Sequence, residues 1–382
     1  MIPAYTDKKN RIELIDAIRG FALFGVLLVN LSMIDSTLFG YEASPFVYET
    51  FVERFLAVCL DVFFTGKFYT LFAMLFGVGF AFFMDRFDQI QFKATYVRRL
   101  MVLFVMGMLH LLFVWYGDIL HVYAIAGWIL FQNRKKTAQT YFKYSAVLFV
   151  VSTLIFVLTA SEPASMTDEV KLALTQANLA YQSSSYLTLF WYRLSYEIPV
   201  LIINLVFVLP KILALFFFGA AIGKIRFFHD LNQYDDKMGT LWKIVVGVGV
   251  FCAVGSIAIQ GNLFNVQNHH LQMLLSETLT LCGALFYALI FIRKRHTKWM
   301  KTIISLLKDA GRMALTNYLM QTIAFTTLIY GYGGDWFGKL GMVDYYLLAL
   351  SFYCMQLVLS KLWLQKFKQG PFEWLWRKIT YL

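Results

Sequence analysis

The sequence predicts an all-α polytopic membrane protein, and three observations indicate this class. Hydrophobic residues make up 59% of the 382 residues and charged residues only 15%. The mean hydropathy of +0.61 is too apolar for a soluble domain of this length. The basic residues gather between long apolar runs, as the positive-inside rule expects. We therefore expect a single integral membrane domain over residues 1–382.

The net charge of +11 suggests either nucleic acid or a membrane surface as a partner. Because the basic residues are clustered between apolar runs, we expect contact with membrane lipids and no nucleic acid. The four cysteines fall inside apolar runs and far apart, which favours packing over disulfides or a metal site. The oligomeric state stays open, and an oligomer is compatible with the sequence.

Ten apolar runs satisfy both hydropathy and charge. We place them near residues 14–34, 55–84, 100–116, 118–132, 141–160, 194–222, 242–260, 272–292, 313–331 and 343–361. The first run is too long for a signal peptide and no cleavage site follows it, so we expect it to stay as an anchor. The basic clusters lie within residues 8–11, 86–99, 134–136, 224–243, 293–312 and 361–378. With these on the inner side, both termini are cytoplasmic.

The second and sixth runs are longer than a bilayer requires. Each would reach roughly 45 Å as a straight helix, against a hydrocarbon core of about 30 Å. Each contains a helix breaker followed by a lysine, Gly66-Lys67 and Pro210-Lys211. We expect kinks or tilt there, with both lysines in the cytoplasmic half of the membrane. Snorkelling of the lysines to the inner headgroups is an equally good interpretation.

The third and fourth runs form a short central hairpin that turns at residues 116–118. Its arms would reach only about 25 and 22 Å, so we expect its tip to lie below the outer surface, in a depression. The hairpin carries His110, Asp118 and His121. Titratable groups at membrane depth are costly unless they pair or line a wet cavity, so they mark a candidate catalytic site.

Asp118 and His121 are three residues apart at the start of a helix, so the carboxylate can hold the imidazole as a general base. A hydrogen-bonded cluster that closes the hairpin is an equally good interpretation, and Asp118 also suits a helix cap. In the first run, Asp16 and Arg19 share a helical face. We favour a structural ion pair between these two residues, a clasp, over binding of a cytosolic ligand. Asn30, near the outer end, either polarises a carbonyl or bridges two helices.

Other polar residues lie inside or beside the runs. Glu197 and Glu277 suit a proton or cation path, although contact with outer water is our preferred interpretation. Arg312 precedes a polar strip in which Asn317 and Gln321 face into the bundle. Residues 161–191 form either a lid on the outer surface or a passive connector. The aromatic and basic residues after 361 are typical of an interfacial amphipathic segment.

Several blocks of the sequence resemble the signatures of the YeiB-like bacterial membrane protein family of unknown function, whose loose label is transport. The resemblance runs the whole length and implies a C-terminal family block at about residues 225–382, in a bacterial cytoplasmic membrane. The blocks are Arg11-x4-Asp16-x2-Arg19-Gly20, Gly66-Lys67-Phe68, Gly117-Asp118-Ile119-Leu120, Gly311-Arg312-Met313-Ala314-Leu315-Thr316-Asn317-Tyr318 and Gly370-Pro371-x-Glu373-Trp374-x-Trp376-Arg377.

More distantly, the opening block is similar to that of the transmembrane acyltransferases. That resemblance implies transfer of an acyl group from cytosolic acyl-CoA to an acceptor on the other face, with Asn30 matching an Asn that closes the first helix. The histidine expected in the following loop is absent, because residues 31–54 contain none. The role would fall to His110 or His121.

Three hypotheses about function fit the sequence: an enzyme, a transporter and a structural scaffold. In the first, a membrane-embedded acyltransferase, an anionic donor such as acyl-CoA binds cationic and polar groups, a histidine held by Asp118 deprotonates the acceptor, and Asn30 stabilises the oxyanion. The donor-binding candidates are Asp16, Arg19, Lys67, Lys211, Arg312 and Asn317. In the second, a secondary transporter, the coupling groups are Asp61, Lys67, Glu277 and His110. A structural scaffold is the third.

Overall fold

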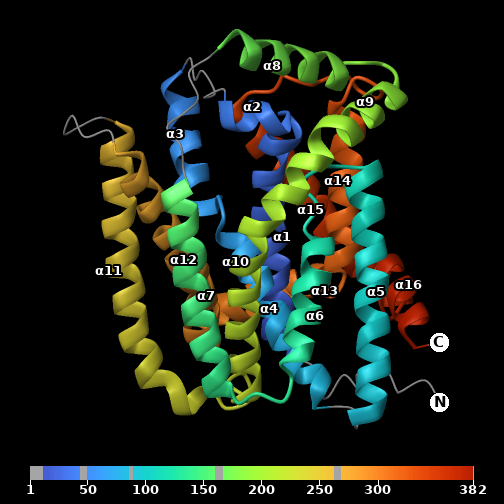
Figure 1. Ribbon diagram of the computed structural model, residues 1–382. Helices are drawn as coiled ribbons and strands as arrows, with labels where there is room; N and C mark the ends of the chain where they lie inside the picture. Colours follow the sequence, from blue (N-terminus) through green and yellow to red (C-terminus); the bar gives the residue numbers. More distant parts are fainter. Residues whose placement is uncertain (1–11, 44–49, 86–88, 160–166, 262–267, 382) are drawn as a thin grey trace.

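The computed structural model describes residues 12–43, 50–85, 89–159, 167–261 and 268–381. Over these residues the secondary structure is entirely helical, which confirms the all-α class. Most of the helices run side by side along one axis, while α8 lies across one end of the bundle (Figure 1). Lys8, Lys9, Arg11 and Arg86, which we used to orient the chain, fall outside the described residues.

The long helices correspond to the predicted runs. Eight helical segments of the described chain are long and apolar enough to cross a membrane, and the shorter α6 and α14 complete the series. The helices are α1 (Glu13–Ile34), α2 (Leu38–Ala43), α3 (Phe51–Cys59), α4 (Lys67–Met84), α5 (Gln89–Phe113), α6 (Leu120–Gln132), α7 (Ala138–Thr159), α8 (Asp168–Tyr181), α9 (Tyr186–Tyr192), α10 (Ile198–Lys224), α11 (Asp235–Gln260), α12 (His269–Arg293), α13 (Lys298–Arg312), α14 (Ala314–Ile329), α15 (Met342–Lys366) and α16 (Pro371–Thr380). Short π-helices occupy Leu60–Phe64 and Arg193–Glu197, and a 3-10 turn occupies Leu231–Tyr234.

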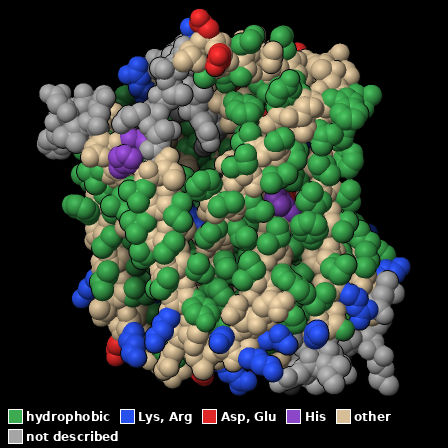
Figure 2. All heavy atoms as spheres, viewed as in Figure 1, with side chains coloured by type: hydrophobic (Ala, Val, Ile, Leu, Met, Phe, Trp, Pro, Cys, Tyr) green, Lys and Arg blue, Asp and Glu red, His purple; other side chains and the backbone are tan. Residues whose placement is uncertain are grey.

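The surface separates by polarity. Apolar side chains cover the broad middle of the visible face, and Lys and Arg gather along its lower edge (Figure 2). Exposed apolar residues such as Val206, Phe251 and Leu347 need an apolar environment, because a protein with so large an apolar surface would aggregate in water. The protein is therefore a polytopic membrane protein. We call the end with the Lys and Arg residues the basic end and the end covered by α8 the outer end (Figure 1).

The two long runs break differently from one another. In the first, the chain leaves the π-helix at Thr65, and Gly66 adopts a left-handed φ of 81° before α4 begins, which confirms the predicted break. The 18 residues of α4 reach about 27 Å. Lys67 therefore lies far from the basic end, and our placement of it in the cytoplasmic half was wrong.

In the second long run, α10 continues through Pro210, so the chain does not leave the helix there as it does at Gly66. The irregular stretch is instead the π-helix at Arg193–Glu197, where α9 joins α10. A wider turn of this kind accommodates an extra residue without ending the helix. It turns the side chains of Arg193 and Glu197 inward, where both are buried.

Close backbone contact holds α4 against α10. A Cβ added to Gly219 would lie 1.8 Å from the carbonyl oxygen of Met74, and one added to Gly77 would lie 2.2 Å from that of Phe216. Small residues let membrane helices approach in this way, because lipid gives no hydrophobic force between them. The pair forms the centre of the bundle.

We expect Gly219→Ala to lower the free energy of unfolding by about 1–3 kcal/mol, because the methyl group forces α4 and α10 apart. Thermal unfolding of the purified protein in detergent measures the effect. Gly247→Ala is the matched control, since a Cβ at this helical position meets nothing within 4 Å. Equal melting temperatures of the two variants would contradict the close packing.

Candidate functional site

The two arms of the hairpin formed by α5 and α6 differ in length. The 13 residues of α6 reach about 20 Å, as predicted for a short arm, whereas the segment Lys93–Phe113 of α5 is long and apolar enough to cross a membrane. The tip of the hairpin is closed on the outer side by hydrogen bonds. The Tyr186 hydroxyl donates to the Phe113 carbonyl at 2.7 Å, and the Tyr116 hydroxyl donates to the Met33 carbonyl at 2.7 Å.

The side chain of Asp118 has no exposed surface. Our expectation that this carboxylate lies open in an outer depression was therefore wrong. The reason is that the chain around α9 and the end of α1 fill the space above the short hairpin, and the sequence of the hairpin does not show this.

At the tip, one carboxylate binds two imidazoles. Asp118 Oδ1 lies 2.9 Å from His110 Nδ1, and Asp118 Oδ2 lies 2.7 Å from His121 Nδ1. The backbone N–H of His121 also donates to Asp118 Oδ2 at 3.1 Å. The carboxylate thus holds two side chains and satisfies an amide at the start of α6. The contact predicted between Asp118 and His121 forms, and His110 joins it from the preceding helix.

The second ring nitrogen of His110 lies in an unusual environment. The Nε2 atom of His110 is buried and has no hydrogen-bond partner among the described residues. The ring of Tyr318 lies against His110, with 5.5 Å between the ring centroids. The Tyr318 hydroxyl is buried without a hydrogen bond of normal geometry. His110 is therefore held at one nitrogen and unpartnered at the other, beside a tyrosine that lines a cavity.

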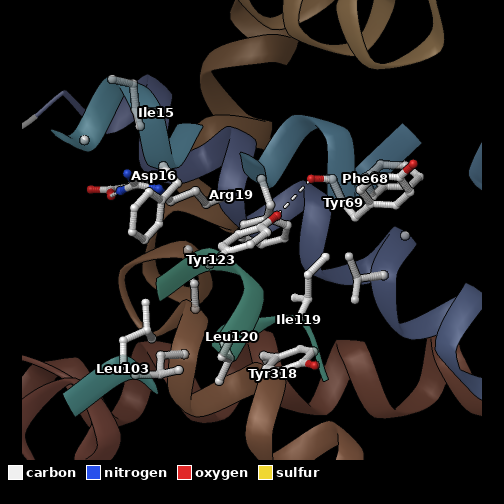
Figure 3. Close-up of a pocket in the computed structure, with 18 of the residues that line it drawn as sticks. Ile15, Asp16, Arg19, Phe68, Tyr69, Leu103, Ile119, Leu120, Tyr123 and Tyr318 are labelled. Carbon is white, nitrogen blue, oxygen red and sulfur yellow. Dashed lines mark hydrogen bonds and ion pairs between the residues drawn. The ribbon is translucent and has the colours of Figure 1, made fainter. Parts of the chain in front are cut away.

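A cavity of about 1150 Å³ runs through the bundle beside the hairpin tip. Figure 3 shows part of it, from Asp16 and Arg19 at one end to Phe68 and Tyr69 at the other, with Tyr123 and Tyr318 between them. The cations in its wall come from six residues, namely Arg19, Arg99, Arg226, Arg312, Lys368 and Arg377. The wall is also rich in aromatic residues, and those around the region shown in Figure 3 include Phe68, Tyr69, Phe72, Phe76, Tyr123 and Tyr318.

Arginines at the basic end of the cavity are held in place by specific contacts. The Arg99 guanidinium lies 3.8 Å from the ring centroid of Trp376, whose indole N–H donates to the Arg99 carbonyl at 2.8 Å. Arg312 pairs with Asp309 at 3.1 Å and also reaches the Lys368 carbonyl at 3.4 Å. Guanidinium groups fixed in this way suit phosphate and carboxylate ligands.

The C-terminal helix α16 completes this wall. The Glu373 carboxylate accepts hydrogen bonds from the backbone N–H groups of Leu315 and Thr316, at 2.8 and 3.1 Å, and from the Thr316 hydroxyl. It thereby caps the N-terminus of α14 from a distant part of the chain. Burial raises the pKa of Glu373, while these hydrogen bonds act against the rise. The segment predicted to be only interfacial therefore also builds the cavity.

The candidate residues separate into two groups. Asn30, Asp16, Arg19 and Arg312 line the cavity; His110, Asp118, His121, Lys67, Lys211 and Asn317 do not. Asp16 and Arg19 pair at 3.4 Å, as the clasp interpretation requires, yet both face the cavity. Asn317 instead donates to the Ala310 carbonyl and the Ser360 hydroxyl, at 3.1 and 3.0 Å, and so joins α13, α14 and α15.

The remaining charged candidates are paired in the interior. Lys67 is 1% exposed and donates to the Asp61 carbonyl at 2.6 Å. Lys211 forms an ion pair with Glu277, and Glu197 is fully buried and accepts from the Tyr181 hydroxyl at 2.8 Å. Our expectation of contact with outer water was wrong for Glu197, which is fully buried, whereas Glu277 lines the cavity.

Sequence reasoning missed Arg99, Trp376 and Tyr318 as cavity residues. The aromatic and basic interleaving near the C-terminus was the available signal for Trp376, and the block ending at Tyr318 was the signal for that residue. Within the described residues there is no group of three His, Cys, Asp or Glu side chains that would hold a metal ion.

We expect Asp118→Asn to lower the free energy of unfolding by about 2–4 kcal/mol. An amide offers one acceptor oxygen where the carboxylate serves two imidazoles and a backbone N–H, so a buried donor loses its partner. The melting temperature in detergent measures the loss. Asp168→Asn on the surface of α8, whose carboxylate is fully exposed, is the control. If both variants have the same melting temperature as the wild type, the cluster does not stabilise the hairpin.

The fold and the cavity define a polytopic α-helical membrane protein with an internal cavity that has arginines at one end and aromatic residues in its wall. Comparison with known proteins then gives the family. The model of the family described as a protein of unknown function, DUF418, matches residues 222–382. The chain belongs to this family, which confirms the resemblance seen in the sequence.

Relatives match over nearly the whole chain. The uncharacterised protein YxaH of Bacillus subtilis is 30% identical over 97% of this chain and 94% of its own length. The uncharacterised protein YeiB of Escherichia coli is 27% identical over 96% and 95% of the two chains. An uncharacterised 39.9 kDa protein of Bacillus acidopullulyticus is 26% identical over 97% and 94%. No solved structure matches the chain.

Proposed function

We propose that the protein is a membrane-embedded acyltransferase of the bacterial cytoplasmic membrane. It takes an acyl group from a cytosolic donor, with acyl-CoA as the co-substrate, and transfers it to an acceptor at the outer side. One observation carries the proposal: a single cavity changes from cationic to aromatic along its length and then reaches Asn30. Such a gradient matches a ligand with an anionic head and an apolar chain.

Each part of the donor has a counterpart in the wall. The phosphates bind at the basic end, where Arg99 and Arg312 are oriented by Trp376 and Asp309, because guanidinium groups pair well with phosphate. The acyl chain lies along the aromatic wall, where burial removes it from water. The basic end faces the cytoplasm by the positive-inside rule, and this is the side on which acyl-CoA is found.

The transfer step uses the groups at the hairpin tip. The acceptor oxygen or nitrogen forms a bond to the acyl carbon, the carbon–sulfur bond breaks, and the acceptor's proton finally resides on the thiol of CoA. Asn30 in the wall hydrogen-bonds the oxyanion. Tyr318 passes the proton to His110 Nε2, and Asp118 orients this imidazole through Nδ1. His110 fits this role better than His121, since its Nε2 is unpartnered beside a cavity residue.

A secondary transporter is the second candidate, and one observation favours it. The Lys211–Glu277 pair is buried within the membrane, and Glu277 lines the cavity close to the helix break at Gly66. Buried ion pairs beside broken helices are typical of coupling sites. Under this function, Glu277→Gln abolishes substrate-driven ion uptake in vesicles, and acyl-CoA does not bind.

We expect Arg99→Gln and Arg312→Gln each to raise the Kd for palmitoyl-CoA about tenfold, since each removes one charge-assisted contact worth roughly 1.4 kcal/mol. Isothermal titration of the purified protein in detergent measures the Kd. Arg134→Gln is the matched control, because Arg134 lies at the basic end without lining the cavity. Absence of binding to the wild type, or equal affinities in all three variants, would contradict the donor site.

We expect Tyr318→Phe and His110→Gln to lower the rate of acyl transfer by about 10²–10⁴-fold, which is the usual contribution of proton transfer. The Kd for palmitoyl-CoA should stay within twofold, since neither side chain reaches the basic end. Transfer of a radiolabelled acyl group to lipids in proteoliposomes provides the rate. Tyr332→Phe, on an outer loop away from the cavity wall, is the control, and equal rates for Tyr318→Phe and Tyr332→Phe would exclude the relay.

A further inference from the structure

One part of the cavity wall comes from the helix break before α4 and from α7 and α12, and we call this part the side arm. It is formed by Phe64, Thr65, Gly66, Phe156, Met273, Ser276, Glu277 and Thr280. These residues are remote from the arginines of the basic end, and the proposed donor does not account for them. The side arm combines apolar side chains with three hydroxyl groups.

Helix lengths place the side arm near the outer boundary of the membrane core. Ser276 lies 17 residues before the end of α12 at Arg293, and Asn30 lies 17 residues after the start of α1 at Glu13. Both positions are therefore roughly 26 Å from the basic end at 1.5 Å per residue, against a hydrocarbon core of about 30 Å. The side arm lies at the depth where outer-leaflet headgroups meet their acyl chains.

Two hydroxyl groups in the side arm are available to hydrogen-bond with a ligand. Among the described residues, neither the Ser276 nor the Thr280 hydroxyl has a hydrogen-bond partner, and both residues line the cavity. Thr280 is only 6% exposed, so its hydroxyl depends on the contents of the cavity for a partner. Glu277 contributes a carboxylate to the same wall, charge-balanced by Lys211. These groups suit a polar but uncharged or cationic group of a ligand.

Access to the side arm is from the bilayer. At the outer end, α2, α8 and α9 cover the bundle (Figure 1), and Tyr181 at the end of α8 accepts a backbone hydrogen bond from Gly331 at 2.9 Å. On the flank, Phe156 lines the cavity and is also 41% exposed on the apolar surface. The wall therefore reaches the lipid-facing side of α7, so a molecule dissolved in the membrane can enter.

We propose that the side arm binds a membrane lipid whose headgroup carries a free hydroxyl or amine. This inference rests on the proposed acyltransferase function and names its acceptor. The headgroup lies between Ser276 and Thr280, and the lipid chains leave past Phe156 into the bilayer. The lipid oxygen or nitrogen bonds to the acyl carbon, the carbon–sulfur bond of the donor breaks, and the proton lost by the lipid is carried to the CoA thiolate.

The test is retention of lipid by the full-length protein. The wild type is reconstituted with equal amounts of phosphatidylethanolamine, phosphatidylglycerol and phosphatidylcholine, extracted in detergent, and analysed by native mass spectrometry. We expect one phosphatidylethanolamine or phosphatidylglycerol molecule per chain, and at least a tenfold lower occupancy in Ser276→Trp, whose indole fills the side arm. Leu274→Trp is the matched control, because Leu274 is 42% exposed and lies outside the cavity wall of the same helix.

Equal occupancy in Ser276→Trp and Leu274→Trp would overturn the inference, as would equal retention of phosphatidylcholine, which carries no free hydroxyl or amine. The Kd for palmitoyl-CoA, measured on the same samples, separates this result from the proposed function. Loss of lipid with an unchanged Kd supports both proposals. Specific lipid retention without any palmitoyl-CoA binding keeps the lipid site and removes the acyltransferase.

Discussion

The structure depends on one constraint, which is that the buried turn of a hairpin in a membrane protein must have partners for its backbone and polar groups. Lipid supplies no hydrogen bonds, so an unpaired group there is costly. Asp118 satisfies this need at the start of α6, and Tyr186 and Arg193 do so at the end of α5 by donating to the carbonyls of Phe113 and Leu111. These contacts allow the chain to turn within the bundle rather than at its surface.

The short hairpin leaves room for a cavity beside it. Because α6 is short, the turn before it lies beside the cavity, and Gly117, Ile119 and Leu120 form part of the cavity wall. Among the described residues, Tyr318 lines the cavity and also packs against His110. The proposed function would therefore place the ligand in the cavity and the titratable groups in the layer beside it.

The C-terminal helix α16 positions an arginine at the basic end of the cavity. Glu373 fixes α16 on the first turn of α14, and Trp376 then holds the Arg99 guanidinium at the cavity. A charge at this position would otherwise be mobile and hydrated. The same helix joins residues from α5, α14 and the C-terminus, so the basic end forms only when the whole chain has folded.

The sequence by itself determined the class of the protein, its ten apolar runs, the break at Gly66 and the contact between Asp118 and His121. These features follow from hydropathy, charge clustering and local spacing, all of which are properties of neighbouring residues. The family resemblance also came from the sequence, through blocks such as the one that ends at Tyr318.

Only the tertiary structure decided which of the candidates share a cavity. Lys67 and Lys211 were predicted to bind the donor, yet each found a partner on the chain, while Arg99 and Trp376 were brought together across 277 residues. Pro210 lies inside α10 without ending it, while the π-helix at Arg193–Glu197 marks the irregular stretch of that run. The physical reason is common to all of these cases: spacing along one helix fixes which face a residue occupies, whereas helix packing fixes what that face meets.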